Sequence, residues 1–305
     1  MKSSLLLSAI VFLTVSGCES NTLQMSSEEV LFESLLVDGE YHLVLNPSGI
    51  SPLSAQLDFE TIVPVEVALT VLGNESLSHN FNQRTKLHSI PIHGLYPGKR
   101  NRILIRITNS ESSVSASHIF TVKTDELPEF FPLIEIQLSD QCRMEPGWTL
   151  ANFSLGDNGS FRTMPFIFDV NGDVRWLIDL SKLGGMTFKV DRFSNGNLRI
   201  GRGNFIYEYN MLGEELKRWE VKGYWHHHDS VEMPNGNILI AVNNQEAPTI
   251  EDHVVELDRE NGEIVRKWDL RELFDSRQLS NSKNQRDWFH MNAIWYSARD
   301  DSLIL

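Results

Sequence analysis

A turn-and-strand motif recurs along the second half of the chain and constrains its fold more than any other feature. One version combines a turn glycine, an acidic residue and a tryptophan, at Val170–Trp176, Met211–Trp219 and Glu260–Trp268. Another is built around Asn-Gly-Asn, at Ser194–Ile200 and Pro234–Ile240, with a weaker copy at Arg299–Leu305. Tight turns that feed strands at a period of roughly 40 to 50 residues are typical of four-stranded propeller blades. Residues 134–305 are therefore predicted to form the first blades of a β-propeller, with a β-solenoid or a large sandwich as the alternatives.

The preceding part of the chain has the two-residue alternation of half-buried strands. The candidate strands are Glu40–Asn46, Val63–Leu72, Arg102–Thr108 and Ser117–Thr124, with turn residues between them. Short strands at this spacing favour an immunoglobulin-like β-sandwich over residues 30–125, followed by a proline-containing linker. The whole chain is thus predicted to be all-β.

The predicted propeller is incomplete within the 305 residues. Residues 134–305 supply about three blades, whereas propellers close with four or more. The chain also ends inside a predicted strand, at Ser302–Leu305. We therefore expect this sequence to be the C-terminally truncated front portion of a longer protein.

The N-terminus has the pattern of a lipoprotein signal peptide over residues 1–18. Lys2 supplies a positive charge, Leu5–Val15 is apolar but short for a membrane span, and small residues precede Cys18. Val15-Ser16-Gly17-Cys18 resembles the lipobox of bacterial lipoproteins, which predicts lipidation of Cys18 and a polar tether over residues 19–29. An ordinary signal peptide or a short anchor is the alternative.

Several acyl chains would hold the protein stably on a membrane, so a cell-envelope or periplasmic location is expected. Glu19 after the cysteine favours the outer membrane over the inner one. Cys142 would then have no partner within the chain, and a buried apolar role is expected for it.

The charge balance limits the classes of partner. With 41 acidic and 27 Lys or Arg residues, the formal net charge is -14. Nucleic-acid binding needs a basic surface that displaces counterions, so it is not expected. A local group of histidines can still bind a small anion.

Two histidine motifs carry the candidate chemistry. Trp225–Asp229 contains His226, His227 and His228, and Asp287–Asn292 contains His290. Each motif precedes a turn-and-strand repeat, so the two occupy corresponding places in successive predicted blades, where side chains converge on a central axis. A histidine there can carry protons, bind anions or attack an electrophile. Channel lining without chemistry is the structural alternative.

Metal binding and serine hydrolysis are the competing interpretations of these residues. Imidazoles suit zinc, copper or nickel. However, neighbours in an extended chain point to opposite sides, so the three adjacent histidines should not face one ion, and no Cys or Glu stands at ligand spacing beside His290. No metal site is therefore predicted. A Gly-x-Ser-x-Gly nucleophile motif is also missing from the sequence.

The ordered set of motifs resembles the bacterial arylsulfate sulfotransferases, over essentially everything after the lipobox. The motifs that carry the resemblance are Asn46–Ala55, Gly94–Gly98, Glu145–Thr149, Phe168–Trp176, Trp225–Asn237, Asp287–Asn292 and Asp300–Ile304. The resemblance implies a six-bladed propeller that transfers a sulfuryl group from a phenolic sulfate ester to a phenol. It implies no nucleotide donor, no metal and no other cofactor, and a sulfohistidine intermediate. A homodimer is one possible assembly.

The resemblance also implies roles for individual residues. His290 matches the histidine expected to bind the sulfuryl group and to stabilise or protonate the phenolate. Asn292 matches the accompanying amide, which could donate a hydrogen bond to a sulfuryl oxygen. His227 and His228 both match the upstream catalytic histidine, and the choice between them is open. Independently of the family, Asp229 is expected to orient an imidazole.

Two further family residues, an arginine and the attacking histidine, would lie beyond Leu305. The 305-residue chain is therefore expected to be inactive by itself. If a continuation lacked these two residues, a non-enzymatic, membrane-tethered propeller lipoprotein acting as a binding or scaffold module would be the better interpretation.

Overall fold

The computed structural model describes residues 28–109, 111, 114–140, 142–157, 160–183, 186–274 and 286–305. Within these ranges the chain consists of strands, two short 3-10 turns (Phe32–Leu35 and Ser181–Leu183) and the one-turn helix α1 (Leu270–Leu273). The prediction of an all-β protein is therefore confirmed. The predicted lipobox with Cys18 lies outside the described residues, as does most of the predicted tether. In the described part, no helix is long and apolar enough to cross a membrane.

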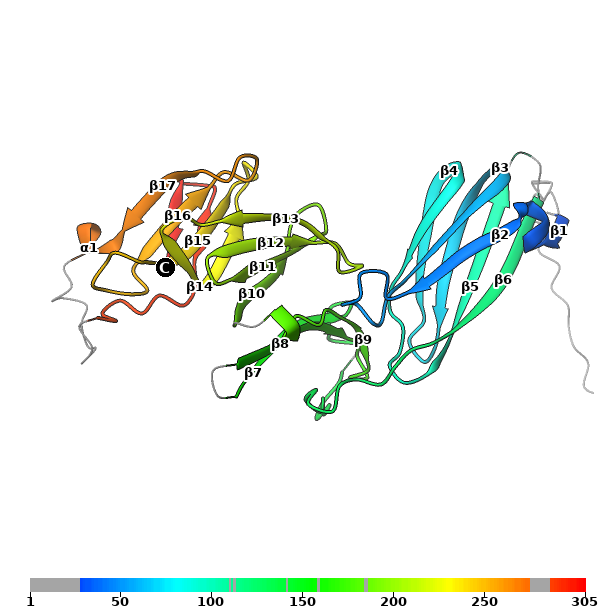
Figure 1. The fold of residues 1–305 in the computed structure, drawn as a ribbon, viewed down its shortest axis with the longest axis horizontal. Coiled ribbons are helices and arrows are strands. Elements are labelled where there is room, and N and C mark those ends of the chain that lie inside the picture. The colour runs from blue at the N-terminus through cyan, green and yellow to red at the C-terminus, as the bar shows by residue number, and fades with distance from the viewer. Residues whose placement is uncertain are drawn as a thin grey trace, which may run out of the picture.

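The N-terminal strands form one six-stranded sheet at one end of the elongated molecule (Figure 1). Its strands are β1 (Glu28–Leu31), β2 (Leu36–Leu45), β3 (Ala55–Leu72), β4 (Leu77–Ile92), β5 (Arg100–Asn109) and β6 (Val114–Lys123). Burial alternates as the sequence predicts: along β5, Ile103, Ile105 and Ile107 are buried, while Arg102 and Arg106 face solvent. The apolar face of the sheet encloses the core of this region.

The long strand β3 changes partner along its length. Ala55–Thr61 pairs with β2, whereas Glu66–Leu72 pairs with β5. Pro64 lies at the change, where the ladder between β3 and β4 is also irregular, and proline has no N–H to donate to a neighbouring strand. The predicted β-sandwich therefore takes the form of a curled sheet in which β3 is shared.

The rest of the chain folds into small antiparallel sheets. The first comprises β7 (Thr149–Asp157), β8 (Ser160–Phe168) and β9 (Val174–Leu177). Two four-stranded sheets follow. One comprises β10 (Thr187–Arg192), β11 (Leu198–Arg202), β12 (Phe205–Tyr209) and β13 (Glu215–Glu220). The other comprises β14 (Tyr224–Glu232), β15 (Ile238–Asn244), β16 (His253–Leu257) and β17 (Ile264–Asp269). The last pair is β18 (Trp295–Ser297) and β19 (Ser302–Ile304). Four strands in chain order are the sheet type of a propeller blade, and closure of these sheets into a ring stays a prediction.

The sequence repeats correspond to repeated contacts. In the Asn-Gly-Asn turns, the Asn197 and Asn237 side chains donate to Glu208 and Glu256 on the third strand of each sheet, at 2.7 and 2.6 Å. Two of the three repeated tryptophans bridge neighbouring sheets. Trp176 Nε1 donates to the Met211 carbonyl at 2.7 Å, and Trp219 Nε1 donates to the Arg259 carbonyl at 2.8 Å. Both indole rings are buried, so these tryptophans pack the sheets together.

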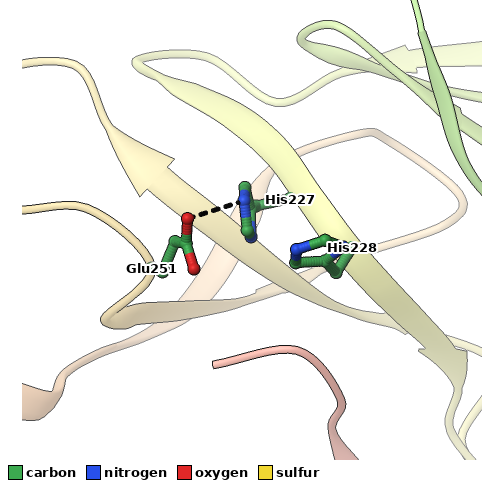
Figure 2. Close-up of side chains that lie close together, drawn as sticks. All are labelled: His227, His228 and Glu251. Carbon is green, nitrogen blue, oxygen red and sulfur yellow. Dashed lines mark ion pairs between the residues drawn. The ribbon is translucent and has the colours of Figure 1, made fainter. Parts of the chain in front are cut away.

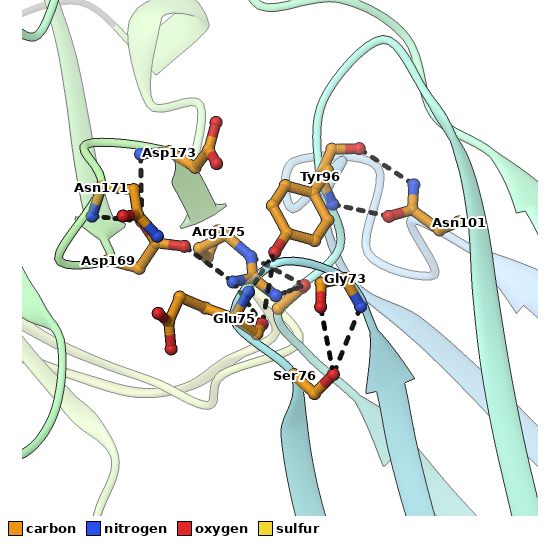
Figure 3. Close-up of polar contacts among 10 residues, drawn as sticks. Gly73, Glu75, Ser76, Tyr96, Asn101, Asp169, Asn171, Asp173 and Arg175 are labelled. Carbon is orange, nitrogen blue, oxygen red and sulfur yellow. Dashed lines mark hydrogen bonds and ion pairs between the residues drawn. The ribbon is translucent and has the colours of Figure 1, made fainter. Parts of the chain in front are cut away.

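A buried arginine joins the six-stranded sheet to the sheets that follow (Figure 3). Arg175 precedes Trp176 in the first repeat, and its side chain has no exposed surface. Its guanidinium donates to the carbonyls of Gly94 and Glu75 at 2.8 to 3.1 Å, and to Asp169 Oδ2 at 2.8 Å. The same group lies 3.8 Å from the centre of the Tyr96 ring. One side chain thus ties turns of the N-terminal sheet to the β8–β9 turn.

Cys142 departs from expectation. It is exposed rather than buried, because it lies in the irregular segment before β7 and not in a packed strand.

Candidate functional site

Strand β14 carries the first histidine motif and pairs irregularly with β15. His226 pairs with Val242 and Ser230 pairs with Ile240, so the three residues 227–229 stand opposite Ala241 alone. His228 has a φ of 51°, in the left-handed region that non-glycine residues rarely adopt. Such a bulge breaks the alternation of side chains along the strand.

The bulge brings two adjacent imidazoles to the same side. The ring centres of His227 and His228 are 4.0 Å apart, with the rings nearly perpendicular. The sequence argument that neighbouring histidines must face opposite sides assumed a regular strand, and it is wrong at this position.

His226, by contrast, is a packed core residue. It is 2% exposed, and within the described part of the chain neither ring nitrogen has a hydrogen-bond partner. The ring lies against Gly201, where an added Cβ would come within 2.3 Å of the imidazole. Burial, reinforced by His227 and Arg199, lowers the pKa of His226 to about 3. His226 is therefore neutral near pH 7 and packs the sheets together.

Glu251 lies beside His227 (Figure 2). His227 Nε2 lies 3.1 Å from Glu251 Oε1, and His228 lies on the other side of His227. Glu251 has a φ of 61°, and its backbone N–H donates to Asn243 Oδ1 at 2.7 Å. Burial, and then the charges of His228 and His290, lower the pKa of His227 to about 4. Burial raises the pKa of Glu251, and Asp287 adds to this effect.

His290 reaches the same carboxylate from the segment before β18. Its Nδ1 lies 3.1 Å from Glu251 Oε2 and 2.7 Å from Asp287 Oδ2. Its side chain is 58% exposed, and its φ of 56° is again left-handed. The hydrogen bond to Asp287, and then the charge of Glu251, raise the pKa of His290. His290 therefore keeps its proton to a higher pH than a free imidazole does, in contrast to His227 and His228, whose pKa burial lowers.

The structure thus brings together His227, His228 and His290, three of the residues predicted from sequence. Asn292 is exposed, and its amide donates to the His290 carbonyl at 3.4 Å. Asp229 does not orient an imidazole in the described part of the chain. Its carboxylate lies 3.1 Å from Lys189 Nζ and accepts from the backbone N–H groups of Ser230 and Ile294, so it connects β14 to the segment before β18.

Sequence reasoning missed the two carboxylates of the site. Asp287 stands three residues before His290 inside the same motif, and this spacing was a usable signal. Glu251 lies in the β15–β16 turn, and no local pattern links it to either histidine motif. The observation that no Glu stands near His290 in sequence therefore did not exclude one in space.

The chemistry available at this site is mixed. The pKa of two imidazoles is lowered, so they offer lone pairs more readily, whereas the pKa of the third is raised, so it holds a proton more tightly. A neutral imidazole can attack an electrophile or bind a metal, and an imidazolium can protonate a leaving group or bind an anion. Proton transfer, group transfer and metal binding are all compatible with these residues.

Comparisons with known proteins agree with one another. The model of the family described as Arylsulfotransferase (ASST) matches residues 120–305, and that of the Arylsulfotransferase Ig-like domain matches residues 42–125. Arylsulfate sulfotransferase AssT of Escherichia coli O6:H1 (strain CFT073) is 23% identical over 394 aligned positions, covering 95% of this chain and 65% of the relative. Arylsulfate sulfotransferase AssT of Lelliottia amnigena is 21% identical over 360 positions, covering 86% of this chain and 60% of the relative.

The chain thus spans less than two thirds of the length of these two relatives. A solved structure of unknown function from Bacteroides caccae aligns with a TM-score of 0.28 and 12% identity, covering 68% of this chain and 74% of that one. A likeness this weak does not bear on the fold.

Proposed function

The chain belongs to the arylsulfotransferase family, and from this premise we propose that it takes part in nucleotide-independent transfer of a sulfuryl group from a phenolic sulfate ester to a phenol. One observation carries the proposal: imidazoles from two distant motifs meet around Glu251, with His227 Nε2 and His290 Nδ1 each 3.1 Å from one of its oxygens. The curated relatives named as arylsulfate sulfotransferases support it.

The proposed reaction has two halves with a sulfohistidine between them. In the first half, a neutral imidazole nitrogen attacks sulfur and an N–S bond forms. The S–O bond to the donor phenol breaks, and its electron pair leaves on the phenolate, which takes a proton from an imidazolium. In the second half, the acceptor phenol oxygen attacks sulfur, the N–S bond breaks, and the acceptor proton returns to the imidazole that lost one.

His290 is proposed as the proton donor to the leaving phenolate. Its contacts with Asp287 and Glu251 are made through Nδ1, so Nε2 on the opposite edge of the exposed ring is directed away from both carboxylates. Asn292 is proposed to donate to a sulfuryl oxygen once its side chain turns from the His290 carbonyl, and His227 and His228 to contact the sulfuryl group. By the resemblance, the attacking histidine belongs to a later blade, and this assignment stays a prediction.

We also propose a location in the cell envelope. Lipidation at Cys18 would anchor the protein to a membrane, the outer membrane in preference to the inner, and expose the site to the periplasm. Metabolic labelling with a palmitate analogue tests this. Label should enter the wild-type protein and not the Cys18→Ser variant, and equal labelling of both would contradict the anchor.

Transfer is measured by the release of 4-nitrophenolate from 4-nitrophenyl sulfate in the presence of phenol. The 305-residue chain should bind the donor without releasing phenolate, whereas a protein extended to the length of the curated relatives should release it only when phenol is added. In the extended protein, His290→Ala should lower kcat by about 100- to 1000-fold, and His42→Ala on the N-terminal sheet should leave it unchanged.

Three outcomes would contradict parts of this proposal. Turnover by the 305-residue chain would place the attacking histidine within it. Full activity of His290→Ala would remove His290 from the site. Failure of the extended protein to transfer any sulfuryl group would leave a non-enzymatic, tethered binding module as the function.

A further inference from the structure

Two of the residues proposed to contact the sulfuryl group belong to a set of side chains that could also hold a metal ion. His227, His228 and Glu251 each offer one ligand atom, and these three atoms lie within 4.8 Å of one another. Two imidazoles and one carboxylate, with a further coordination position left open, form a ligand set used by catalytic zinc sites. Figure 2 shows the three side chains together.

The distances are close to those that an ion requires. Ligand atoms at 2.0 to 2.2 Å from a tetrahedral zinc ion lie about 3.3 to 3.6 Å apart. His227 Nε2 and Glu251 Oε1 are already 3.1 Å apart. His228 is only half-buried, so a rotation of its ring can bring the third ligand atom closer.

The backbone holds the ligands from two directions. The β14 bulge and the left-handed φ of His228 turn two adjacent imidazoles to the same side. Glu251, also left-handed, is fixed through Asn243 Oδ1 at 2.7 Å and through its own carbonyl, which accepts from Met291 N–H at 3.2 Å.

The neighbours of Glu251 match the surroundings of a metal-bound carboxylate. Its second oxygen, Oε2, is 3.1 Å from His290 Nδ1, which also contacts Asp287. An imidazolium at His290 would hold this oxygen from outside the ligand set by its charge, while its Nδ1–H donates to Asp287. The carboxylates of Glu251 and Asp287 also place negative charge beside the two imidazoles.

We propose that His227, His228 and Glu251 bind one divalent transition-metal ion of the zinc class, with His290, itself held by Asp287, contacting Glu251 from outside the ligand set. The site goes beyond the proposed sulfuryl transfer, which uses no metal, and an ion held here would occupy imidazole nitrogens that are proposed to contact the sulfuryl group. The ion would leave at least one coordination position for a water molecule or for an oxygen of an anionic ligand.

Isothermal titration of Zn²⁺ into the chelator-treated, tag-free 305-residue chain tests this site. One ion per chain should bind, and His228→Asn and Glu251→Gln should each weaken the affinity at least tenfold. Asparagine tolerates the left-handed conformation of position 228, and glutamine keeps the shape of position 251, so both variants should fold. His42→Ala, which removes an exposed histidine from the N-terminal sheet, should bind as the wild type does.

A second probe separates this ligand set from its neighbour, Glu251, Asp287 and His290. Co²⁺ should give the visible absorption of a tetrahedral nitrogen–oxygen site, which Glu251→Gln abolishes and Asp287→Asn largely keeps. If Asp287→Asn lost metal binding as severely as Glu251→Gln while His228→Asn bound normally, the assigned ligands would be wrong. Absence of stoichiometric binding, or equal weakening by His42→Ala, would overturn the site itself. Neither result bears on phenol-dependent transfer, which is measured separately.

Discussion

At the scale of single residues, four histidines close in sequence or space occupy different environments. Burial holds the pKa of His226 and His227 at about 3 and about 4, whereas two carboxylates raise that of the exposed His290. The residue types and their relation to the repeats were predictable from sequence. The burial and the charged neighbours of these histidines were not predictable, because Glu251 comes from a turn with no motif of its own.

The protonation of His290 depends on Asp287. Removing the carboxylate charge with Asp287→Asn should lower the pKa of His290, because the hydrogen bond to Asp287 is the largest cause of its raised value. A group that must be protonated loses activity as pH rises through its pKa, so the basic limb of a phenolate-release profile should move to lower pH in this variant. NMR titration of the His290 ring measures the change directly. Asp125→Asn, at an exposed position far along the chain, is the control, and an unchanged His290 titration in Asp287→Asn would contradict the assignment.

At the scale of elements, the bulge in β14 decides which histidines form the site. The repeats predicted the strands and their turns, since Asn-Gly-Asn turns and alternating apolar residues act locally. They did not predict the bulge, which depends on the packing of β14 against the neighbouring sheet. There, Arg199 donates to the side chain and carbonyl of Ser230 at 3.2 and 2.9 Å, and Gly201 leaves room for His226. The alternation of apolar and polar residues also did not predict that β3 changes its partner strand at Pro64.

Gly201 is expected to be essential to this packing. An Ala side chain there would overlap the His226 ring, so Gly201→Ala should destabilise the fold by about 1 to 3 kcal/mol. Urea unfolding measures the loss. In a His226→Ala background the ring that would be overlapped is absent. Gly201→Ala should therefore lower the free energy of unfolding much less in that background than in the wild type. Equal costs in both backgrounds would show that the ring does not need this space.

At the scale of the whole molecule, the all-β class and the family membership followed from the order of the motifs. The contacts that join the N-terminal sheet to the sheets after it could not be predicted from the motifs. Arg175 stands in a repeat whose other copies place their basic residue on an exposed face, as Arg218 shows with a side chain that is 60% exposed. Only the structure reveals that Arg175 is buried and holds Gly94, Glu75 and Asp169 together.

Arg175→Met is expected to destabilise the joint strongly. It leaves the Asp169 carboxylate buried without its cation, which costs about 3 to 5 kcal/mol. The double variant Arg175→Met/Asp169→Asn should recover part of the loss, because the unpaired charge is removed. Arg218→Met, on the exposed face of β13, should change stability by less than about 0.5 kcal/mol. Urea unfolding of all four proteins compares them, and a mild effect of Arg175→Met would mean that the joint does not depend on this ion pair.

His227, His228 and His290 are proposed to form one site for an aryl sulfate. This proposal is tested most directly by titrating 4-nitrophenyl sulfate into the histidine-labelled chain and following each imidazole by NMR. The signals of His227, His228 and His290 should move together with a single dissociation constant, while those of the exposed His42 and His79 should not move. Movement of His290 alone, or of the three histidines with different dissociation constants, would contradict a shared site.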